Sequence, residues 1–146
     1  MKTITVHHIF NAPIDAVFEA VTNSARLPSV FGQGIRMVSP AAGPDPDGVG
    51  AIREVNAWPV WFREEITRFE RPHRMDYHIM EVRPHFEHLD GKFLFETVPG
   101  GTRVTWTTTV RFLGPFAGLK AALAGPLTAT TFKAVLVAVD KLMPAG

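Results

Sequence analysis

The chain of 146 residues contains no cysteine. This absence excludes a disulfide scaffold, thiolate metal sites and a cysteine nucleophile, and it is compatible with a reducing compartment. A chain of this length buries roughly 70% of the surface that its unfolded form exposes, so it can form a core without cross-links. We therefore expect a single domain that spans residues 1–146.

An excess of charge is also lacking, since 15 lysines and arginines stand against 14 acidic residues. No basic stripe stands out, which argues against a nucleic-acid partner. The longest uncharged run near the C-terminus, residues 121–132, is interrupted by Gly125-Pro126 and by threonines, so we expect no membrane span. The first eight residues are too polar for a signal peptide, and we expect a cytoplasmic protein.

Several motifs that carry chemistry are missing as well. The serines lack a G-x-S-x-G context, and the segment 32–34 lacks the lysine and the following helix of a phosphate-binding loop. His7 and His8 point to opposite faces of a predicted strand, and His85 and His88 form only a His-x-x-His pair, which is short of a zinc pattern. The sequence therefore predicts neither a metal nor a cofactor.

What the chain does contain is a series of alternating apolar and polar segments. These predict strands over residues 3–10, 35–39, 51–58, 61–69, 75–80, 87–98 and 103–112. The clearest is 103–112, where Val104, Trp106, Thr108 and Val110 share one face and polar residues share the other. A helix is predicted over 13–22, a short second helix over 23–32, and a proline- and glycine-rich loop over 40–50.

A long amphipathic helix is predicted over residues 115–143, with Lys133, Asp140 and Lys141 on its solvent side. Gly125-Pro126 predicts a kink, or alternatively a helix that begins at Pro126. A helical-wheel projection of this segment places Leu136 and Val137 on the outer side. It predicts a buried face of Thr128, Thr131, Val135, Ala138, Val139 and Leu142. One long helix after many strands favours an α+β fold, in which a sheet curls around the helix and leaves a cavity between them.

The inward faces of these elements supply candidate ligand-binding residues. Small-molecule pockets are mostly apolar and contain a few placed polar groups. The candidates are Trp58, Tyr77, Phe93, Phe95, Trp106, Thr108 and Val110 from the strands, with Thr128, Thr131 and Val135 from the helix. The alternative, that these side chains simply pack as core, remains open.

Two carboxylates are candidate acid–base groups. Glu64 points inward if Phe62 and Ile66 do, and Glu54 points inward if Ile52 and Trp58 do. A buried carboxylate could act in an aldol-type cyclisation or a dehydration. The alternatives are a strand register that is shifted by one residue, or a neighbouring arginine that pairs with the carboxylate.

The chain resembles the START-like SRPBCC superfamily, in its polyketide cyclase/dehydrase-type branch. The resemblance covers nearly the whole chain. The stretches that carry it are Phe10-Asn11-Ala12-Pro13-Ile14-Asp15-Ala16-Val17-Phe18, Gly48-Val49-Gly50-Ala51-Ile52-Arg53-Glu54-Val55, Glu65-Ile66-Thr67-Arg68-Phe69-Glu70-Arg71-Pro72 followed by Met75-Asp76-Tyr77, and Gly100-Gly101-Thr102-Arg103-Val104-Thr105-Trp106.

This resemblance implies a helix-grip fold, in which a seven-stranded antiparallel sheet grips a long C-terminal helix over a cavity for apolar or aromatic molecules. It implies binding, or transport, of such a small molecule. We expect a monomer or a homodimer. A cyclase or dehydratase acting on a polyketide-like substrate is one alternative. A protein-interaction module with a vestigial cavity is another. No catalytic residue of the family maps onto a specific position of this chain, and fold alone does not decide among these functions.

Overall fold

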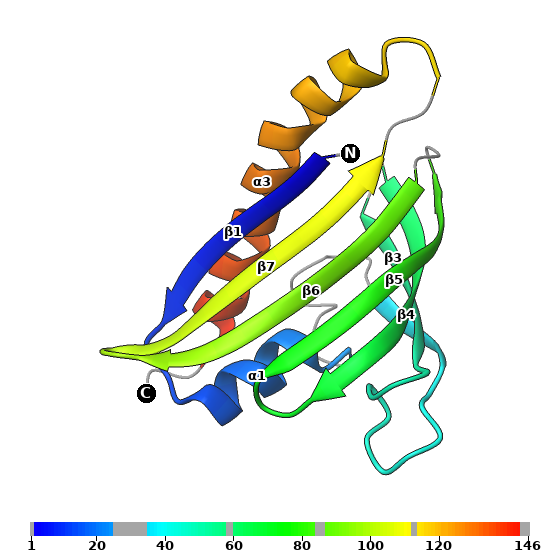
Figure 1. Ribbon diagram of the computed structural model, residues 1–146. Helices are drawn as coiled ribbons and strands as arrows, with labels where there is room; N and C mark the ends of the chain where they lie inside the picture. The colour runs from blue at the N-terminus through cyan, green and yellow to red at the C-terminus, as the bar shows by residue number, and fades with distance from the viewer. Residues whose placement is uncertain (1, 25–34, 58–59, 84–86, 112–113, 144–146) are drawn as a thin grey trace.

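The computed structural model describes residues 2–24, 35–57, 60–83, 87–111 and 114–143. Its described strands form one antiparallel sheet in the order β1-β7-β6-β5-β4-β3-β2, which curves around a long helix (Figure 1). The predicted α+β helix-grip fold is confirmed. The elements are β1 (Lys2–Phe10), α1 (Ile14–Thr22), β2 (Ile35–Ser39), β3 (Ile52–Ala57), β4 (Val60–Glu70), β5 (Arg74–Arg83), β6 (Glu87–Val98), β7 (Gly101–Arg111) and α3 (Ala117–Leu142).

Strand β1, at the start of the chain, pairs antiparallel with strand β7, which precedes the C-terminal helix. Lys2 is the register partner of Val110, and Phe10 is the partner of Thr102. On the outer face, Thr3 and Thr5 hydrogen-bond across the strands with Thr109 and Thr107, at oxygen–oxygen distances of 3.1 and 3.3 Å. Because strand residues alternate between faces, these outer threonines leave the inner positions of both strands for the core.

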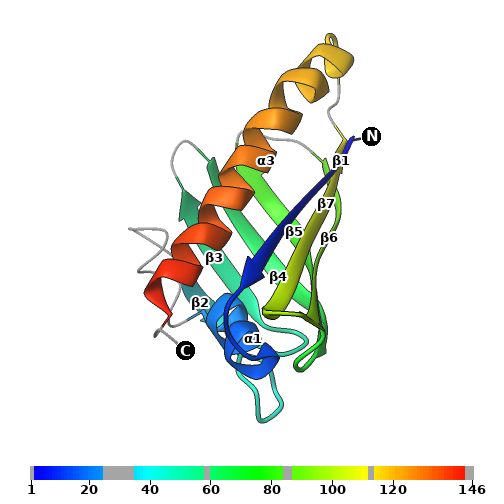
Figure 2. The ribbon, with the colours of Figure 1, turned by 90° about the vertical axis from the view of Figure 1, so that its left-hand side faces the viewer.

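Helix α3 runs along one face of the sheet and packs chiefly against β1, with fewer contacts to β7 and α1. Figure 2 shows it crossing in front of the sheet, while α1 lies at the end of the sheet where α3 finishes. Pro126 lies inside the helix. The alternative in which the helix begins at Pro126 is therefore wrong.

The buried face of α3 differs from the predicted one. Leu136 and Val139 are buried, whereas Thr131 and Leu142 are exposed, so the assignment of Leu136 to the outer side is wrong. The prediction assumes that the charged residues of the helix mark its solvent-facing side. Two of them, Lys133 and Asp140, instead contact strand β1.

Both of those pairings involve His8, which sits on the inner side of β1. Asp140 Oδ2 lies 2.8 Å from His8 Nε2. Lys133 Nζ lies 3.0 Å from His8 Nδ1 and donates to the carbonyl oxygen of His7 at 2.5 Å. His8 is half-buried, and both of its ring nitrogens have partners.

No helix in the part of the chain that the structure describes is long and apolar enough to cross a membrane. The predicted short helix over 23–32 falls almost wholly on residues outside the described ranges.

Candidate functional site

A group of stacked aromatic rings, here called the aromatic wall, covers the inner face of the sheet under α3. It consists of Tyr77 on β5, Phe93 and Phe95 on β6, Trp106 on β7 and Phe132 on α3. The ring centroids of Phe93 and Trp106 are 4.5 Å apart. Those of Trp106 and Phe132 are 3.7 Å apart, with an angle of 4° between the ring planes. The wall therefore runs without a break from the middle of the sheet to the helix.

The polar atoms of the aromatic wall are bonded to one another. Trp106 Nε1 donates a hydrogen bond to the Tyr77 hydroxyl oxygen at 2.8 Å, and the Thr108 side chain also bonds Tyr77. Both aromatic residues are buried, and buried Tyr and Trp side chains usually find such partners. This bond fixes the edge of each ring and leaves their apolar faces toward the interior.

A glycine on the neighbouring strand makes room for the tyrosine ring. Gly91 is the register partner of Tyr77. A Cβ atom at position 91 would lie 2.4 Å from Tyr77 Cζ and 2.6 Å from Cε2. The ring therefore lies across the backbone of β6 at a place where that strand has no side chain.

Burial raises the pKa of Tyr77 well above its ordinary value of about 10, because the phenolate would be desolvated; the nearby Glu64 carboxylate adds to the increase. Tyr77 is also the single tyrosine of the chain. An ultraviolet titration of tyrosinate absorbance therefore reports this residue alone.

We expect no tyrosinate signal near pH 10 in the folded protein. In the unfolded chain the group ionises near its ordinary pKa, so the stability that burial of the neutral phenol contributes is complete below about pH 10 and decreases as the pH rises further. Tyrosinate absorbance and loss of the circular dichroism signal should thus appear together. A reversible titration near pH 10 with an intact spectrum would contradict the burial of Tyr77.

A buried ion cluster lies on the same inner face, beyond Tyr77. Arg53 Nε and Nη2 donate to Glu64 Oε1 at 2.9 and 2.7 Å. Arg53 Nη1 donates to the Thr22 carbonyl oxygen at 2.9 Å and lies 3.4 Å from Asp47 Oδ1. The Ser24 backbone N–H donates to the Asp47 carboxylate at 3.3 Å. One guanidinium thus ties α1, the 40–50 loop and strands β3 and β4 together.

Glu64 is the predicted acid candidate that the structure places inside. Its side chain is 7% exposed, and it lies on the same face of β4 as the buried Ile66. Arg53 also pairs with it, which is one of the alternatives given by the sequence. Both of these bonds end on Oε1, and Oε2 accepts no hydrogen bond from the described part of the chain.

The prediction that Glu54 points inward is wrong, because its side chain faces outward. It accepts hydrogen bonds from Arg63 and Arg36, both at 3.1 Å to Oε2. The Arg63 hydrogen bond is the main cause that holds the pKa of this carboxyl below its ordinary value, and Arg36 adds to it. Arg53 and Val55 are the residues of β3 that point inward. The predicted inward face, which contained Ile52 and Glu54, is therefore shifted by one residue.

The remaining candidates divide into three groups. Thr108 and Val110 are buried on the inner face of β7, as predicted. Thr128 and Val135 are half-buried on α3, whereas Thr131 is exposed because the buried stripe of the helix passes through Phe132, Leu136 and Val139 instead. Trp58 lies outside the described residues.

Two pockets lie away from the aromatic wall. One, of about 410 Å³, is at the C-terminal end of α1 and is lined by residues that include Glu19, Asp45, Asp47 and Arg71. Its charges are paired, since Arg71 donates to Glu19 Oε2 and to Asp45 Oδ2, each at 2.9 Å. The other, of about 390 Å³, lies between the start of α1 and the β6–β7 turn. Neither brings an unpaired acid–base group together with the aromatic rings.

Sequence reasoning missed Asp47 and Gly91 as parts of the site, and it gave Arg53 only as an alternative partner of a carboxylate. A pattern of alternation was present for Arg53, because Ala51 and Val55 share its face of β3 and both are buried. Asp47 lies in a loop without an alternating pattern, so the sequence does not show that its carboxylate is buried between Arg53 and the Ser24 backbone N–H. For Gly91, nothing in the sequence indicated the tyrosine ring beside it.

The sequence profile of the family described as polyketide cyclase/dehydrase and lipid transport matches residues 1–143. The chain belongs to this family. Its START-like SRPBCC resemblance is thereby confirmed. No curated protein sequence matches this family member.

Solved structures share the fold of this polyketide cyclase/dehydrase and lipid transport family member. TTHA0849 from Thermus thermophilus is 19% identical with a TM-score of 0.77, covering 95% of this chain and 94% of that one. Ara h 8.0201 is 18% identical with a TM-score of 0.73, covering 95% of each chain. The Aha1 dimer from Colwellia psychrerythraea is 15% identical with a TM-score of 0.69, covering 96% and 94%. At these identities the likeness shows the fold alone.

Proposed function

We propose that this family member binds a small apolar or aromatic molecule between the inner face of the sheet and α3. The observation that carries the proposal is the aromatic wall, in which buried rings from three strands pack on one another and on Phe132 of the helix. Such a surface suits flat or acyl-chain ligands, because pockets for small molecules are lined mainly by apolar and aromatic groups.

The arrangement of α3 supports this proposal. The helix packs chiefly against β1, at one edge of the sheet. Strands β4, β5 and β6 present their inner residues farther from it, and the Arg53–Glu64 pair lies on this side. A ligand placed beside Phe132 would contact rings along its length and would meet Glu64 Oε2 at one end. A ligand with an apolar body and one hydrogen-bond donor would fit these groups.

The first test is native mass spectrometry of the purified protein beside its denatured mass. A bound apolar molecule that is lost on denaturation supports the proposal and identifies the ligand class. If the protein is isolated without ligand, a thermal-shift screen with fatty acids and aromatic polyketides follows, because a ligand that binds only the folded state raises the unfolding temperature. A clean apo mass together with no shift from any of these compounds would contradict the proposal.

The binding surface is tested by one pair of neighbouring positions on β7. Trp106→Ala removes an inward ring and is expected to weaken binding of an apolar ligand at least about tenfold, from the apolar contact area lost. Thr107→Ala, on the outer face, is the matched control and should leave binding unchanged. Trp106→Phe keeps an aromatic ring and serves as a milder variant in case Trp106→Ala does not fold. Equal effects at positions 106 and 107 would refute the assignment of faces.

A second candidate function is a cyclase or dehydratase activity on a polyketide-like substrate. The observation that favours it is Glu64, a buried carboxylate whose Oε1 accepts both hydrogen bonds from Arg53 and whose Oε2 accepts none from the described residues. That second oxygen would act as a general base. Under this alternative, Glu64→Gln keeps ligand binding and abolishes turnover. If turnover of a bound substrate survives the substitution, Glu64 is not the base.

A further inference from the structure

We propose that the projecting N-terminal end of α3 docks onto an anionic lipid surface. This end, here called the α3 tip, comprises Pro115, Phe116, Leu119, Lys120 and Ala122. The inference is independent of ligand binding in the interior, because it concerns only exposed residues beyond the sheet.

The α3 tip extends past the sheet. A Cβ atom at Gly125 would lie 2.7 Å from Lys2 Cε, so the first residue of β1 rests against the helix at that point. The helix begins at Ala117, and the segment before Gly125 therefore continues for about two turns, or roughly 12 Å, beyond the strand. Both ribbon views show this end of α3 standing clear of the strands (Figures 1 and 2).

The α3 tip is apolar where it projects. Phe116 is 76% exposed and Leu119 is 57% exposed. Phe116 also occupies the left-handed backbone region, with a φ of 65°, which is uncommon for a bulky residue that is not glycine. The core does not account for this conformation, because the ring is turned to solvent. Pro115 and Ala122 are exposed beside it.

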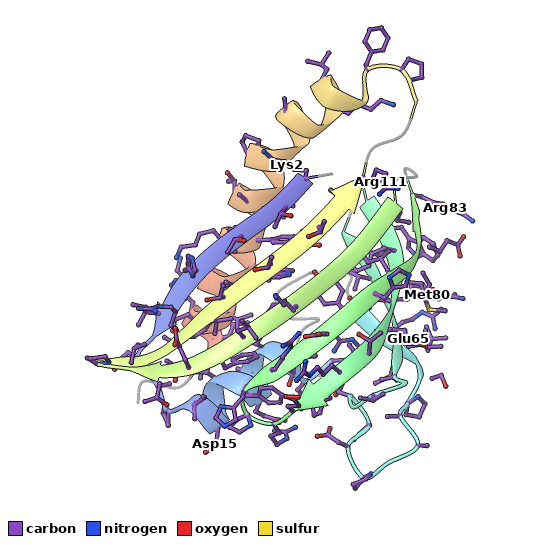
Figure 3. The ribbon with its side chains drawn as sticks, in the orientation of Figure 1. Lys2, Asp15, Glu65, Met80, Arg83 and Arg111 are labelled. Atoms are coloured by element: carbon purple, nitrogen blue, oxygen red, sulfur yellow. The ribbon has the colours of Figure 1, made fainter. Side chains whose placement is uncertain are left out.

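The surrounding charge is positive. No acidic residue occurs between Thr97 and Val139, a stretch that contains two arginines and two lysines. Figure 3 shows Lys2, Arg83 and Arg111 at the end of the sheet from which the α3 tip extends. At this end, Glu81 pairs with Arg83 at 3.1 Å.

Lys120 adds positive charge within the α3 tip, and Lys2 adds it about two turns along the helix, beside Gly125. A phenylalanine and a leucine flanked by lysines match the interface of a bilayer, where rings enter among the acyl chains and ammonium groups meet anionic headgroups. A protein partner would need a broad surface of about 800 Å² on each side, and a narrow projecting turn does not offer this. Charge and shape therefore favour a lipid surface.

The experiment is co-sedimentation of the full chain with vesicles of phosphatidylcholine, with and without phosphatidylserine. We expect association with the mixed vesicles, weaker association with the neutral ones, and release as salt is raised. Phe116→Ala/Leu119→Ala is expected to lower the partition coefficient on mixed vesicles about tenfold or more. Lys120→Glu should lower it on mixed vesicles but not on neutral ones.

Leu142→Ala is the matched control, since Leu142 is 58% exposed at the opposite end of the same helix. It should leave vesicle binding unchanged, and thermal unfolding should show that all variants remain folded. Absence of wild-type binding to the mixed vesicles would overturn the proposal, and so would an equal loss in Leu142→Ala. Self-association by light scattering that Phe116→Ala/Leu119→Ala abolishes would make the α3 tip a protein contact instead. None of these readouts depends on an interior ligand, so the proposed function can fail or hold separately.

Discussion

Arg53→Met is expected to lower the free energy of unfolding by about 3–5 kcal/mol, measured by urea denaturation followed by circular dichroism. The side chain is 3% exposed, and it pairs with Glu64 and Asp47, whose side chains are 7% and 11% exposed. Removing it leaves two carboxylates inside the protein without a counter-charge. The Thr22 carbonyl oxygen also loses its donor, which adds a desolvation cost.

The control for this prediction lies one strand away. Arg36 pairs with Glu54 at 3.1 Å, but its side chain is 63% exposed, so Arg36→Met should cost less than about 1 kcal/mol. In the Arg53→Met background, Glu64→Met is expected to recover part of the loss, because an apolar pair replaces an isolated charge. An Arg53→Met protein as stable as the wild type would contradict the burial of this cluster.

Gly91→Ala is expected to destabilise the fold by about 3 kcal/mol and to disturb ligand binding. The new methyl group would lie within 2.8 Å of three atoms of the Tyr77 ring. That ring cannot swing into solvent without breaking its bond to Trp106 Nε1 and exposing a buried surface. Displacing it would remove one end of the aromatic wall. The thermal midpoint and the indole fluorescence should therefore change together.

Gly43→Ala is a suitable comparison, since a Cβ at position 43 would meet nothing within 4 Å. Its stability should stay within about 0.5 kcal/mol of the wild type. A double-mutant cycle with Tyr77→Val tests the mechanism. If the clash with the ring is the cause, the cost of Gly91→Ala decreases once the ring is gone, and the two changes are not additive. Additive costs would indicate strain in the backbone of β6 instead.

The sequence predicts correctly which side chains of a strand point inward wherever the opposite face of that strand is uniformly polar. On β7 the outer positions carry threonines and arginines, and Val104, Trp106, Thr108 and Val110 are all buried as expected. The same holds for Phe93 and Phe95 on β6. Period-two alternation reports burial directly in such strands, because a shift of one residue would exchange the two faces completely.

Prediction was wrong where charged residues are buried or paired. The Ile52-Arg53-Glu54-Val55 segment has a charge on each face, so the alternation alone cannot show which charge is buried with its partner. On α3, Lys133 and Asp140 mark the solvent side of the predicted wheel, and their contacts with His7 and His8 rotate the buried face toward Leu136. The error on β3 arises from pairings with the neighbouring strand and loop, and the error on α3 arises from contacts between segments far apart in the chain.

The pairing of β1 with β7 also determines the order in which the chain can acquire its structure during synthesis. Lys2 has its partner in Val110, and Phe18 of α1 packs against Phe95, with ring centroids 4.9 Å apart. The N-terminal segments therefore leave the ribosome long before their partners do, and loop closure over such separations slows folding. The hairpins from β3 to β6 can form first, while β1 waits with an unpaired edge and is the segment most in need of protection from aggregation.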